Sequence, residues 1–212
     1  MNNPLLNKIK IALPPVFRQE DAIRCLANTH KAPQKVLESL VRSAALVRLK
    51  RGVYAFADDF DELLAASILY GPSYASFETA LSQHGLIPER VEGVLSVVDG
   101  RKRVFNTPMG EFTYFAQRRQ LYALGMTLVE RRHYSVPIAT PEKALLDTLM
   151  RARLITGDMS DDDIWNYVER GLRVDGDDLR RLSLGHCRAM APLYRSNGPK
   201  LFVEALARRI RQ

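Results

Sequence analysis

Residues 46–57, with the sequence LVRLKRGVYAFA, restrict the fold of this chain more than any other stretch. They contain two short runs, Leu46–Lys50 and Val53–Ala57, whose β-branched, aromatic and alternating residues are typical of strands. Arg51 and Gly52 separate the runs, and a glycine at the point of reversal favours a β-hairpin. The sequence therefore predicts a hairpin with a basic tip.

Three helices are expected ahead of this hairpin, and they cover residues 4–13, 17–27 and 33–45. Pro14 and Pro15 end the first helix because proline cannot continue it, and Pro33 suits the first turn of the third. A short polar turn at residues 28–30 joins the last two helices. Helix, turn, helix and hairpin in this order predict a winged helix-turn-helix over residues 1–57.

The positive charge of the chain is confined to this same segment. The whole sequence has a net charge of +7, and residues 1–57 hold ten basic and three acidic groups. The remaining residues, 58–212, carry equal numbers of basic and acidic groups and are neutral overall. A polyanionic partner is therefore expected to meet the N-terminal segment first.

The second helix of such a pair buries one stripe and offers the other to a DNA groove. The inward stripe is expected to be Val36, Leu37, Leu40, Val41 and Ala44. Side chains for reading base edges are expected at Gln34, Lys35 and Ser39. Contacts to phosphates or to a minor groove are expected from Lys31, Arg42, Arg48, Lys50 and Arg51.

Residues 58–212 are expected to form a second, α+β domain. Helices are predicted over residues 58–70 and 74–84, and a period of two over residues 92–115 predicts a small antiparallel sheet. A further strand is expected within residues 127–134, and Thr140 is expected to cap the next helix. The C-terminal third is expected to be helical, over residues 161–170, 177–194 and 199–211.

Two interpretations are open for the basic residues near the sheet of this domain, which are Arg101, Lys102, Arg103, Arg118 and Arg119. The sequence slightly favours solvated turn residues; the alternative is a second basic face that would extend the DNA footprint or contact a partner. Residues 58–89, by contrast, carry six acidic and no basic groups, so a phosphate backbone would be repelled there.

Enzymatic chemistry finds little support in the sequence. A nuclease site on the sheet would pair Asp99 with Glu111, but position 113 is Thr113 where a lysine is needed. Phosphate-binding loops, dinucleotide motifs and metal-ligand motifs are missing, so neither a cofactor nor a metal is expected. The sequence predicts a protein that is not an enzyme, with a nuclease fusion and a protein-interaction adaptor as the alternatives.

The sequence also bears on where the chain acts. It lacks both an apolar stretch of the roughly 20 residues needed to span a bilayer and a signal peptide. Cys25 and Cys187 are isolated thiols, and neither has a nearby cysteine partner. A cytoplasmic protein without membrane contact is therefore expected.

Three stretches of the chain resemble the AbiEi-type antitoxins, a family of winged-helix regulators. They are LVRLKRGVY at residues 46–54, PSYASFETALSQHGLIPE at residues 72–89, and ATPEKALLD at residues 139–147. The resemblance covers about residues 35–150 and leaves the last third of the chain without a counterpart.

This resemblance implies a transcriptional autorepressor that binds inverted repeats of double-stranded DNA in its own promoter. It further implies the antitoxin of an abortive-infection (phage-defence) toxin–antitoxin system, whose partner is the nucleotidyltransferase toxin AbiEii. Residues 73–150 would then take part in neutralising the toxin. Whether that requires direct contact with the toxin is left open.

Overall fold

The computed structural model describes residues 4–89, 91–131 and 133–210. Its N-terminal elements follow the predicted order of helices and hairpin, with one short strand added: α1 (Pro4–Ala12), β1 (Val16–Arg18), α2 (Gln19–Ala27), α3 (Pro33–Arg42), β2 (Leu46–Lys50) and β3 (Val53–Phe56). The three strands form an antiparallel sheet in the order β1-β3-β2. The predicted hairpin is confirmed, and Gly52 occupies its turn with a φ of +79°.

Two predictions for this segment are corrected. The helix expected from residue 17 starts at Gln19, because Val16, Phe17 and Arg18 pair with β3 as a third strand. The third helix ends at Arg42, and Ala44 has a φ of +56° and is exposed, so it does not belong to the inward stripe. Tertiary pairing in the first case and the turn into β2 in the second override the local helical pattern.

The middle of the chain holds a six-stranded sheet in the order β6-β7-β5-β4-β9-β8. Its strands are β4 (Ser73–Ala75), β5 (Val94–Val98), β6 (Arg103–Thr107), β7 (Gly110–Ala116), β8 (Met126–Glu130) and β9 (Ser135–Ala139). The prediction of a small antiparallel sheet is wrong: β5 pairs with β7 and β4 with β9 in parallel, so the sheet is mixed. Asp99 and Gly100 follow β5, which does not pair with β6, and they are therefore not a hairpin turn.

The short strand β4 explains much of this difference. A helix was expected over residues 74–84, but only α5 (Phe77–Gln83) is helical, and Ser73–Ala75 is extended. These three residues are buried between β5 and β9, where backbone pairing on both sides satisfies their polar groups. A three-residue central strand is too short to leave a period in the sequence.

Helices flank the sheet and fill the C-terminal end of the molecule. They are α4 (Glu62–Leu69), α6 (Arg119–Tyr122), α7 (Pro141–Ala152), α8 (Asp161–Asn166), the π-helical η1 (Tyr167–Gly171), α9 (Gly176–Arg181), α10 (Leu184–Met190), the 3₁₀ turn η2 (Ala191–Leu193) and α11 (Gly198–Arg209). Thr140 caps α7 as predicted, its hydroxyl accepting from the backbone N–H of Lys143 at 3.3 Å. The helix expected over residues 177–194 is broken into α9, α10 and η2; the one expected to Arg211 ends at Arg209, and Arg211 lies outside the described residues.

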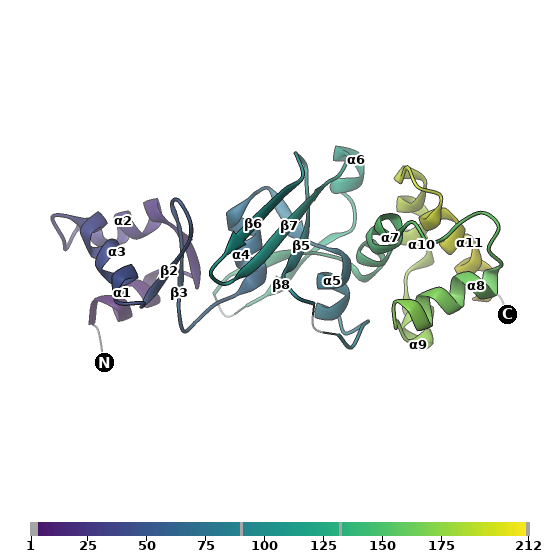
Figure 1. Ribbon diagram of the computed structural model, residues 1–212, viewed down its shortest axis with the longest axis horizontal. Helices are drawn as coiled ribbons and strands as arrows, with labels where there is room; N and C mark the ends of the chain where they lie inside the picture. The colour runs from purple at the N-terminus through teal and green to yellow at the C-terminus, as the bar shows by residue number, and fades with distance from the viewer. Residues whose placement is uncertain (1–3, 90, 132, 211–212) are drawn as a thin grey trace.

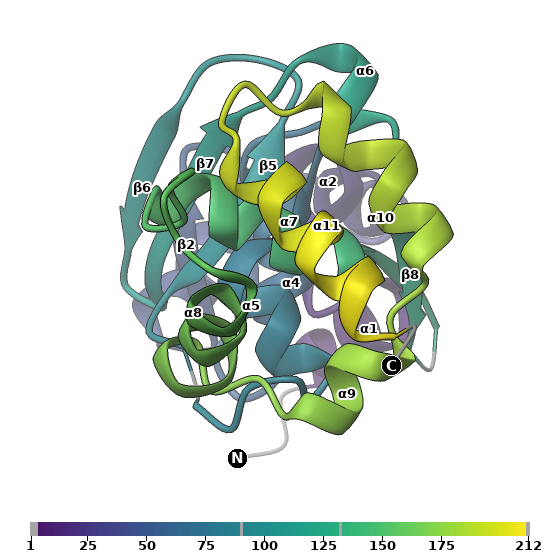
Figure 2. The ribbon, with the colours of Figure 1, turned by 90° about the vertical axis from the view of Figure 1, so that its right-hand side faces the viewer.

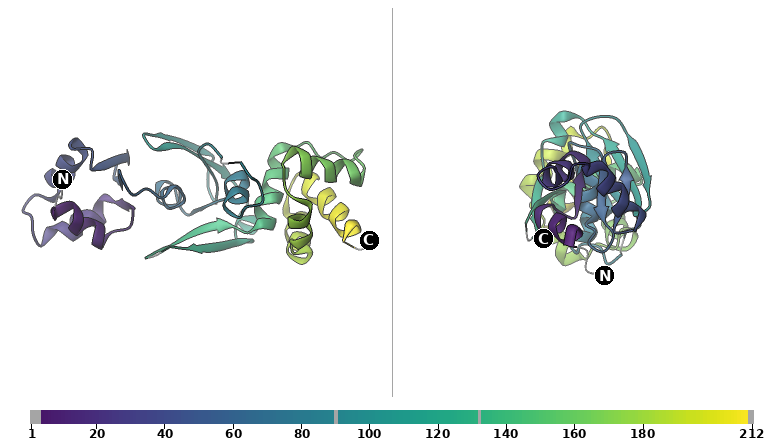
Figure 3. Two further views of the ribbon diagram at one scale, coloured as in Figure 1. Left: turned by 90° about the horizontal axis from the view of Figure 1, so that it is seen from below. Right: turned by 90° about the vertical axis from the view of Figure 1, so that its left-hand side faces the viewer.

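The molecule is elongated (Figure 1), with α1, α2 and α3 at one end, the six-stranded sheet in the middle, and α8 to α11 at the other end. Figure 2 looks onto that far end, where α10 and α11 lie in front of α7. The view from below shows the same three layers along one axis, and the view from the N-terminal side looks down that axis (Figure 3).

Two clusters of buried hydrophobic residues stabilise these layers. The N-terminal cluster contains Ile9, Phe17, Ala22, Leu26, Leu37, Leu40, Leu46, Tyr54 and Phe56. The main cluster extends through the sheet and the C-terminal helices, and it also takes in Val16, Leu49, Val53 and Ala55 from the N-terminal sheet. Because β1, β2 and β3 contribute to both clusters, the hairpin is packed against the rest of the protein.

Among the described residues, no helix is long and apolar enough to cross a membrane. The same part of the chain contains no grouping of three or more His, Cys, Asp or Glu side chains that fits a metal ion.

Candidate nucleic-acid interface

Helix α3 is fixed by its buried stripe. Leu37 and Leu40 are 2% and 3% exposed and pack in the N-terminal cluster, while Val36 and Val41 are partly buried beside them. Proline at the first helical position provides the N–H-free start that a helix tolerates there. The opposite side of the helix is exposed and carries Gln34, Lys35, Glu38, Ser39 and Arg42. Four of the predicted DNA-binding residues therefore share one solvent-facing surface.

The turn between α2 and α3 continues this surface. Lys31 is exposed directly before α3 begins at Pro33. The turn is tied to α1, because the Lys8 ammonium donates to the Thr29 hydroxyl at 3.2 Å. Thr29 in turn donates to the carbonyl oxygen of Leu26. Hydrogen bonds from this turn to α1 and to Leu26 thus fix the segment that leads into Lys31.

The hairpin presents two further arginines. Arg48 in β2 and Arg51 at the tip are both exposed, as predicted. Their neighbours Leu49 and Val53 are buried in the main cluster, which anchors the base of the hairpin. The tip is therefore rigidly supported while its charged side chain points to solvent.

Lys50 was expected at the same surface, but it lies elsewhere. Its ammonium donates to the backbone carbonyl of Leu69 and stands 5.2 Å from the ring centre of Phe105. Partial burial and the nearby positive charges of Arg18 and Arg103 lower the pKa of this ammonium. Lys50 is thus a contact between the hairpin and the middle layer, and we leave it out of the proposed DNA surface.

Arg18 is a basic residue that the sequence analysis missed. It is exposed in β1, paired in register with Val53, and close enough to Lys50 to affect its pKa. A helix was expected to include this residue, and Arg18 in a helix would not pair with Val53 of the hairpin. The pattern Val-Phe-Arg directly after two prolines was the only available sign of an extended segment.

Two other N-terminal cations, Lys10 and Arg24, have acidic partners. The Lys10 ammonium lies 2.6 Å from a carboxylate oxygen of Asp58, and this contact lowers the pKa of Asp58. The guanidinium of Arg24 lies 3.6 Å from Asp21. These pairs reduce the charge that Lys10 and Arg24 offer to a ligand, while Lys8 on α1 keeps its charge exposed beside the turn before α3.

The five residues of the second basic face are all exposed: Arg101, Lys102, Arg103, Arg118 and Arg119. Two of them lie over aromatic rings, with Lys102 5.4 Å from the ring centre of Phe115 and Arg103 5.3 Å from that of Tyr70. Such cation–π contacts fix the side chains but leave their charge accessible. Arg103 also acts on Lys50 electrostatically, which connects this face with the hairpin.

The carboxylates considered for a nuclease site lie apart. In the parallel pair of β5 and β7, Glu111 precedes Phe112, the partner of Val94, whereas Asp99 follows Val98, the partner of Ala116. About six residues of strand, or roughly 20 Å, therefore separate Asp99 from Glu111. They cannot bind one metal ion.

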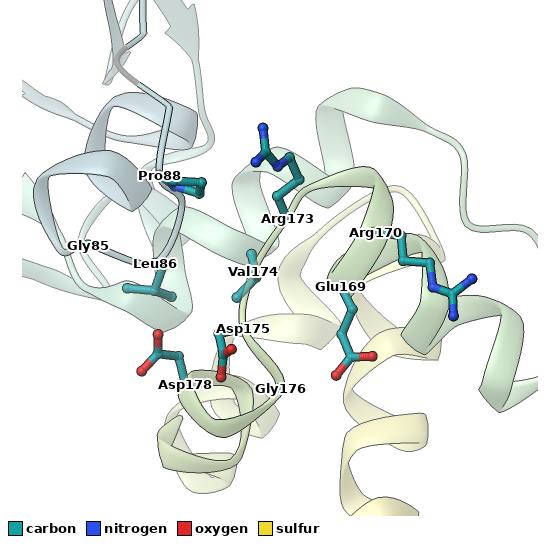
Figure 4. A pocket seen from close by; sticks show the side chains of 10 residues that line it. All are labelled: Gly85, Leu86, Pro88, Glu169, Arg170, Arg173, Val174, Asp175, Gly176 and Asp178. Atoms are coloured by element: carbon teal, nitrogen blue, oxygen red, sulfur yellow. The ribbon is translucent and has the colours of Figure 1, made fainter.

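One cavity is an open groove of about 690 Å³ between residues 85–88 and 169–178 (Figure 4). Its walls mix both charges: Glu169, Asp175 and Asp178 carry carboxylates, and Arg170 and Arg173 carry guanidiniums that point away from each other. Arg173 is already paired with Glu89 across the groove. This arrangement offers no concentrated charge to a nucleic acid.

The fold defines a mixed α/β protein with an N-terminal layer of helices and a hairpin. It is similar to the crystal structure of the RV2827C protein from Mycobacterium tuberculosis, with a TM-score of 0.52 and 16% sequence identity. The match covers 96% of this chain and 79% of that one, so the similarity concerns the fold of nearly the whole chain. No protein-family model matches the sequence, and no curated protein does either.

Proposed function

We propose that the protein is a DNA-binding transcriptional regulator whose residues 1–57 act as a winged helix-turn-helix. In this proposal α3 is the recognition helix, and the β2–β3 hairpin is the wing. The observation that carries it is the exposure of Gln34, Lys35, Ser39 and Arg42 on one side of α3, opposite a buried leucine stripe. An exposed Arg51 at a supported hairpin tip provides the second contact.

The charges of this surface suit a duplex. Lys31, Arg42, Arg48 and Arg51 would contact phosphates or the minor groove and release the counterions bound there. Gln34, Lys35 and Ser39 would face base edges, with glutamine suited to adenine and lysine to guanine. Arg18 would add a phosphate contact beside the hairpin. The protein is proposed to bind DNA without catalysing a reaction, in the cytoplasm and without a cofactor.

Binding of duplex DNA is tested by electrophoretic mobility shift with the DNA upstream of the protein's own reading frame. Several phosphate contacts predict an affinity that falls steeply between about 50 and 200 mM salt. A scrambled duplex of the same length is the control for sequence preference. The protein failing to bind either duplex at low salt would contradict the proposal.

The biological role we propose is autorepression as the antitoxin of an AbiE-type system. Its support is the resemblance of residues 46–54, 72–89 and 139–147 to that family. The partner would be a nucleotidyltransferase toxin, and binding to inverted repeats would place two copies of this chain on each operator. Co-expression of the chain with a neighbouring nucleotidyltransferase gene tests the role. A folded variant lacking residues 1–57 should still rescue growth, and its failure would argue against neutralisation through residues 73–150.

The second basic face is proposed to lengthen the DNA footprint. Its proximity to the hairpin supports this extension. Lys50 of the hairpin lies over the ring of Phe105, and Arg103 lies over Tyr70, whose ring centre is 6.0 Å from that of Phe105. Replacing Arg101 and Lys102 together by glutamate should shorten the protected region in a footprinting experiment. An unchanged footprint would leave these residues as solvated turn residues.

A further inference from the structure

Another cavity, of about 330 Å³, lies where the six-stranded sheet meets the C-terminal helices. It is bordered by the end of β7, by α6, and by the segment that follows α10. Figures 1 and 2 both show α6 next to that segment, at the top of each view. Elements about 75 residues apart in the sequence thus build one pocket from opposite sides.

The floor of this cavity is a rigid polar network. Gln117 and Tyr194 line the cavity although they are only 8% and 4% exposed. The Gln117 amide N–H donates to Asp147 at 2.6 Å, and the Tyr194 hydroxyl donates to the same carboxylate oxygen at 2.6 Å. The Lys143 ammonium donates to that oxygen at 2.5 Å and to the Gln117 carbonyl oxygen at 2.8 Å.

The network fixes both lining groups in place. Lys143 and Asp147 are completely buried and neutralise each other, and Ser76 donates to the second oxygen of Asp147 at 2.6 Å. An amide NH₂ has two N–H groups, and among the described residues only one of those of Gln117 is used. Because Gln117 lines the cavity, it keeps one N–H for a further acceptor. The floor is therefore a preorganised hydrogen-bond donor on a charge-neutral base.

The mouth of the cavity is positive and its walls are apolar. Arg118 and Arg195 are exposed at the rim, and within residues 4–89, 91–131 and 133–210 neither guanidinium forms an ion pair. Leu121 and Leu193 form part of the wall between rim and floor. Arginine binds carboxylates in a planar, two-pronged geometry, and apolar walls favour a hydrocarbon body.

We propose that this cavity binds a small organic acid, with its carboxylate held by Arg118 and Arg195 and its apolar body between Leu121 and Leu193. A polar atom on that body would accept from Gln117 at the floor. The volume is at the lower end of the range found for small-molecule sites. None of the residues that line this site belongs to α3 or to the β2–β3 hairpin. Arg118 is shared with the second basic face, so occupation of the site is measured without DNA.

The test uses the full-length protein without DNA. 8-Anilinonaphthalene-1-sulfonate is the first probe, because it combines an anionic group with an apolar body and becomes fluorescent in apolar sites. 4-Phenylbutyrate should displace it with a saturable dependence on concentration. The uncharged 4-phenylbutyramide and inorganic phosphate should displace it at least about tenfold less well, since each lacks one of the two features.

Matched variants locate the bound probe. Arg118→Gln and Arg195→Gln should each weaken displacement by 4-phenylbutyrate about tenfold, the expected loss for one charge-assisted hydrogen bond. Arg119→Gln removes an exposed arginine adjacent in sequence that does not line the cavity, and it should leave displacement unchanged. Leu193→Trp should fill the cavity and abolish displacement, with unaltered circular dichroism showing that the fold is kept.

The proposal is overturned if 4-phenylbutyramide or phosphate competes as well as 4-phenylbutyrate. It is equally overturned if Arg119→Gln has the same effect as Arg118→Gln, or if 4-phenylbutyrate does not displace the probe at all. None of these outcomes bears on DNA binding, which is measured separately by mobility shift.

Discussion

Tyr54 and Ala55 are neighbours in β3, yet their side chains are buried in different hydrophobic clusters. Tyr54 packs with Phe17 and Phe56 in the N-terminal cluster, and Ala55 lies in the main cluster with no exposed surface. Successive residues of a strand point to opposite faces, so a single strand between two layers contributes to both. The hairpin is therefore a shared wall between the proposed DNA-binding layer and the sheet.

Because the hairpin is a shared wall, polar substitutions in it should destabilise the full chain but improve the solubility of an isolated N-terminal fragment. Replacing Leu49 and Val53 by threonine should destabilise the full chain by roughly 1.5–3 kcal/mol each, the value of burying such side chains. In a fragment of residues 1–57 the same side chains would be exposed, so the substitutions should improve its solubility. Urea unfolding of the full chain and light scattering of the fragment measure the two effects. If the fragment of residues 1–57 is equally soluble with and without the substitutions, the hairpin is not a shared wall.

Arg51→Ala should weaken binding to all duplexes and reduce the salt slope by about one unit, because one phosphate or minor-groove contact is lost. Arg188→Ala removes an exposed arginine at the opposite end of the molecule, in α10, and serves as the matched control. Titrations of each variant with duplex DNA at several salt concentrations give the salt slopes of Arg51→Ala and Arg188→Ala. An identical slope for Arg51→Ala and the unaltered protein would show that the hairpin tip does not contact DNA.

Changes on α3 should alter base preference instead of overall affinity. Lys35→Ala or Gln34→Ala is expected to change discrimination at particular base pairs by roughly 1–3 kcal/mol, because their side chains face base edges. Selection of binding sites from a randomised duplex pool reveals such changes position by position. If the variants select the same sequence as the unaltered protein, α3 does not read the bases.

Removing one partner of the buried Lys143–Asp147 pair should be costly. The two side chains are completely buried 2.5 Å apart, so Lys143→Met leaves a carboxylate without its cation and should cost about 3–5 kcal/mol. Adding Asp147→Asn to that variant should recover part of the loss, because the charge disappears while an acceptor remains. Asp178→Asn, in the surface pair with Arg181, should cost at most about 1 kcal/mol. Urea denaturation compares the variants, and no recovery in the double variant would contradict the charge argument.

Cys187 predicts a loss of stability at alkaline pH. Burial raises the pKa of its thiol to about 12, against an ordinary value of about 8.5 in the unfolded chain. Between these values the thiol ionises only after unfolding, so its contribution is complete below about pH 8.5 and is lost as the pH rises. The slope is up to about 1.4 kcal/mol per pH unit.

Comparison with Cys187→Ala isolates this contribution from those of the buried tyrosines. The unfolding free energy of the unaltered protein should fall relative to that of Cys187→Ala between about pH 9 and pH 11. This range lies roughly between the pKa values of the thiol in the unfolded and the folded chain. Iodoacetamide at pH 8 should label the partly exposed Cys25 in the native protein and Cys187 only in urea. Labelling of native Cys187 at a rate like that of Cys25 would refute the assigned burial.

Strong local patterns were sufficient to predict the order of the N-terminal helices and the hairpin, although not where α2 begins or α3 ends. Proline stops, a polar turn and a glycine reversal each act over a few residues, so their outcome does not depend on distant parts of the chain. The same holds for the Thr140 cap of α7 and for the exposed face of α3, where helical period alone separates Gln34 and Lys35 from Leu37.

Pairing between strands that lie far apart in the sequence could not be predicted from such local patterns. β4 is a three-residue strand whose partners, β5 and β9, follow it by about 20 and 60 residues, and parallel pairing of β5 with β7 left no local mark. Lys50 has the composition of a DNA contact, but Leu69 and Phe105 decide where its ammonium lies. The sequence by itself determined the local elements and the uneven charge, because these depend on near neighbours. Only the tertiary structure decided the sheet order, the shared hairpin and the cavity between Arg118 and Arg195, because each requires residues far apart in the chain to meet.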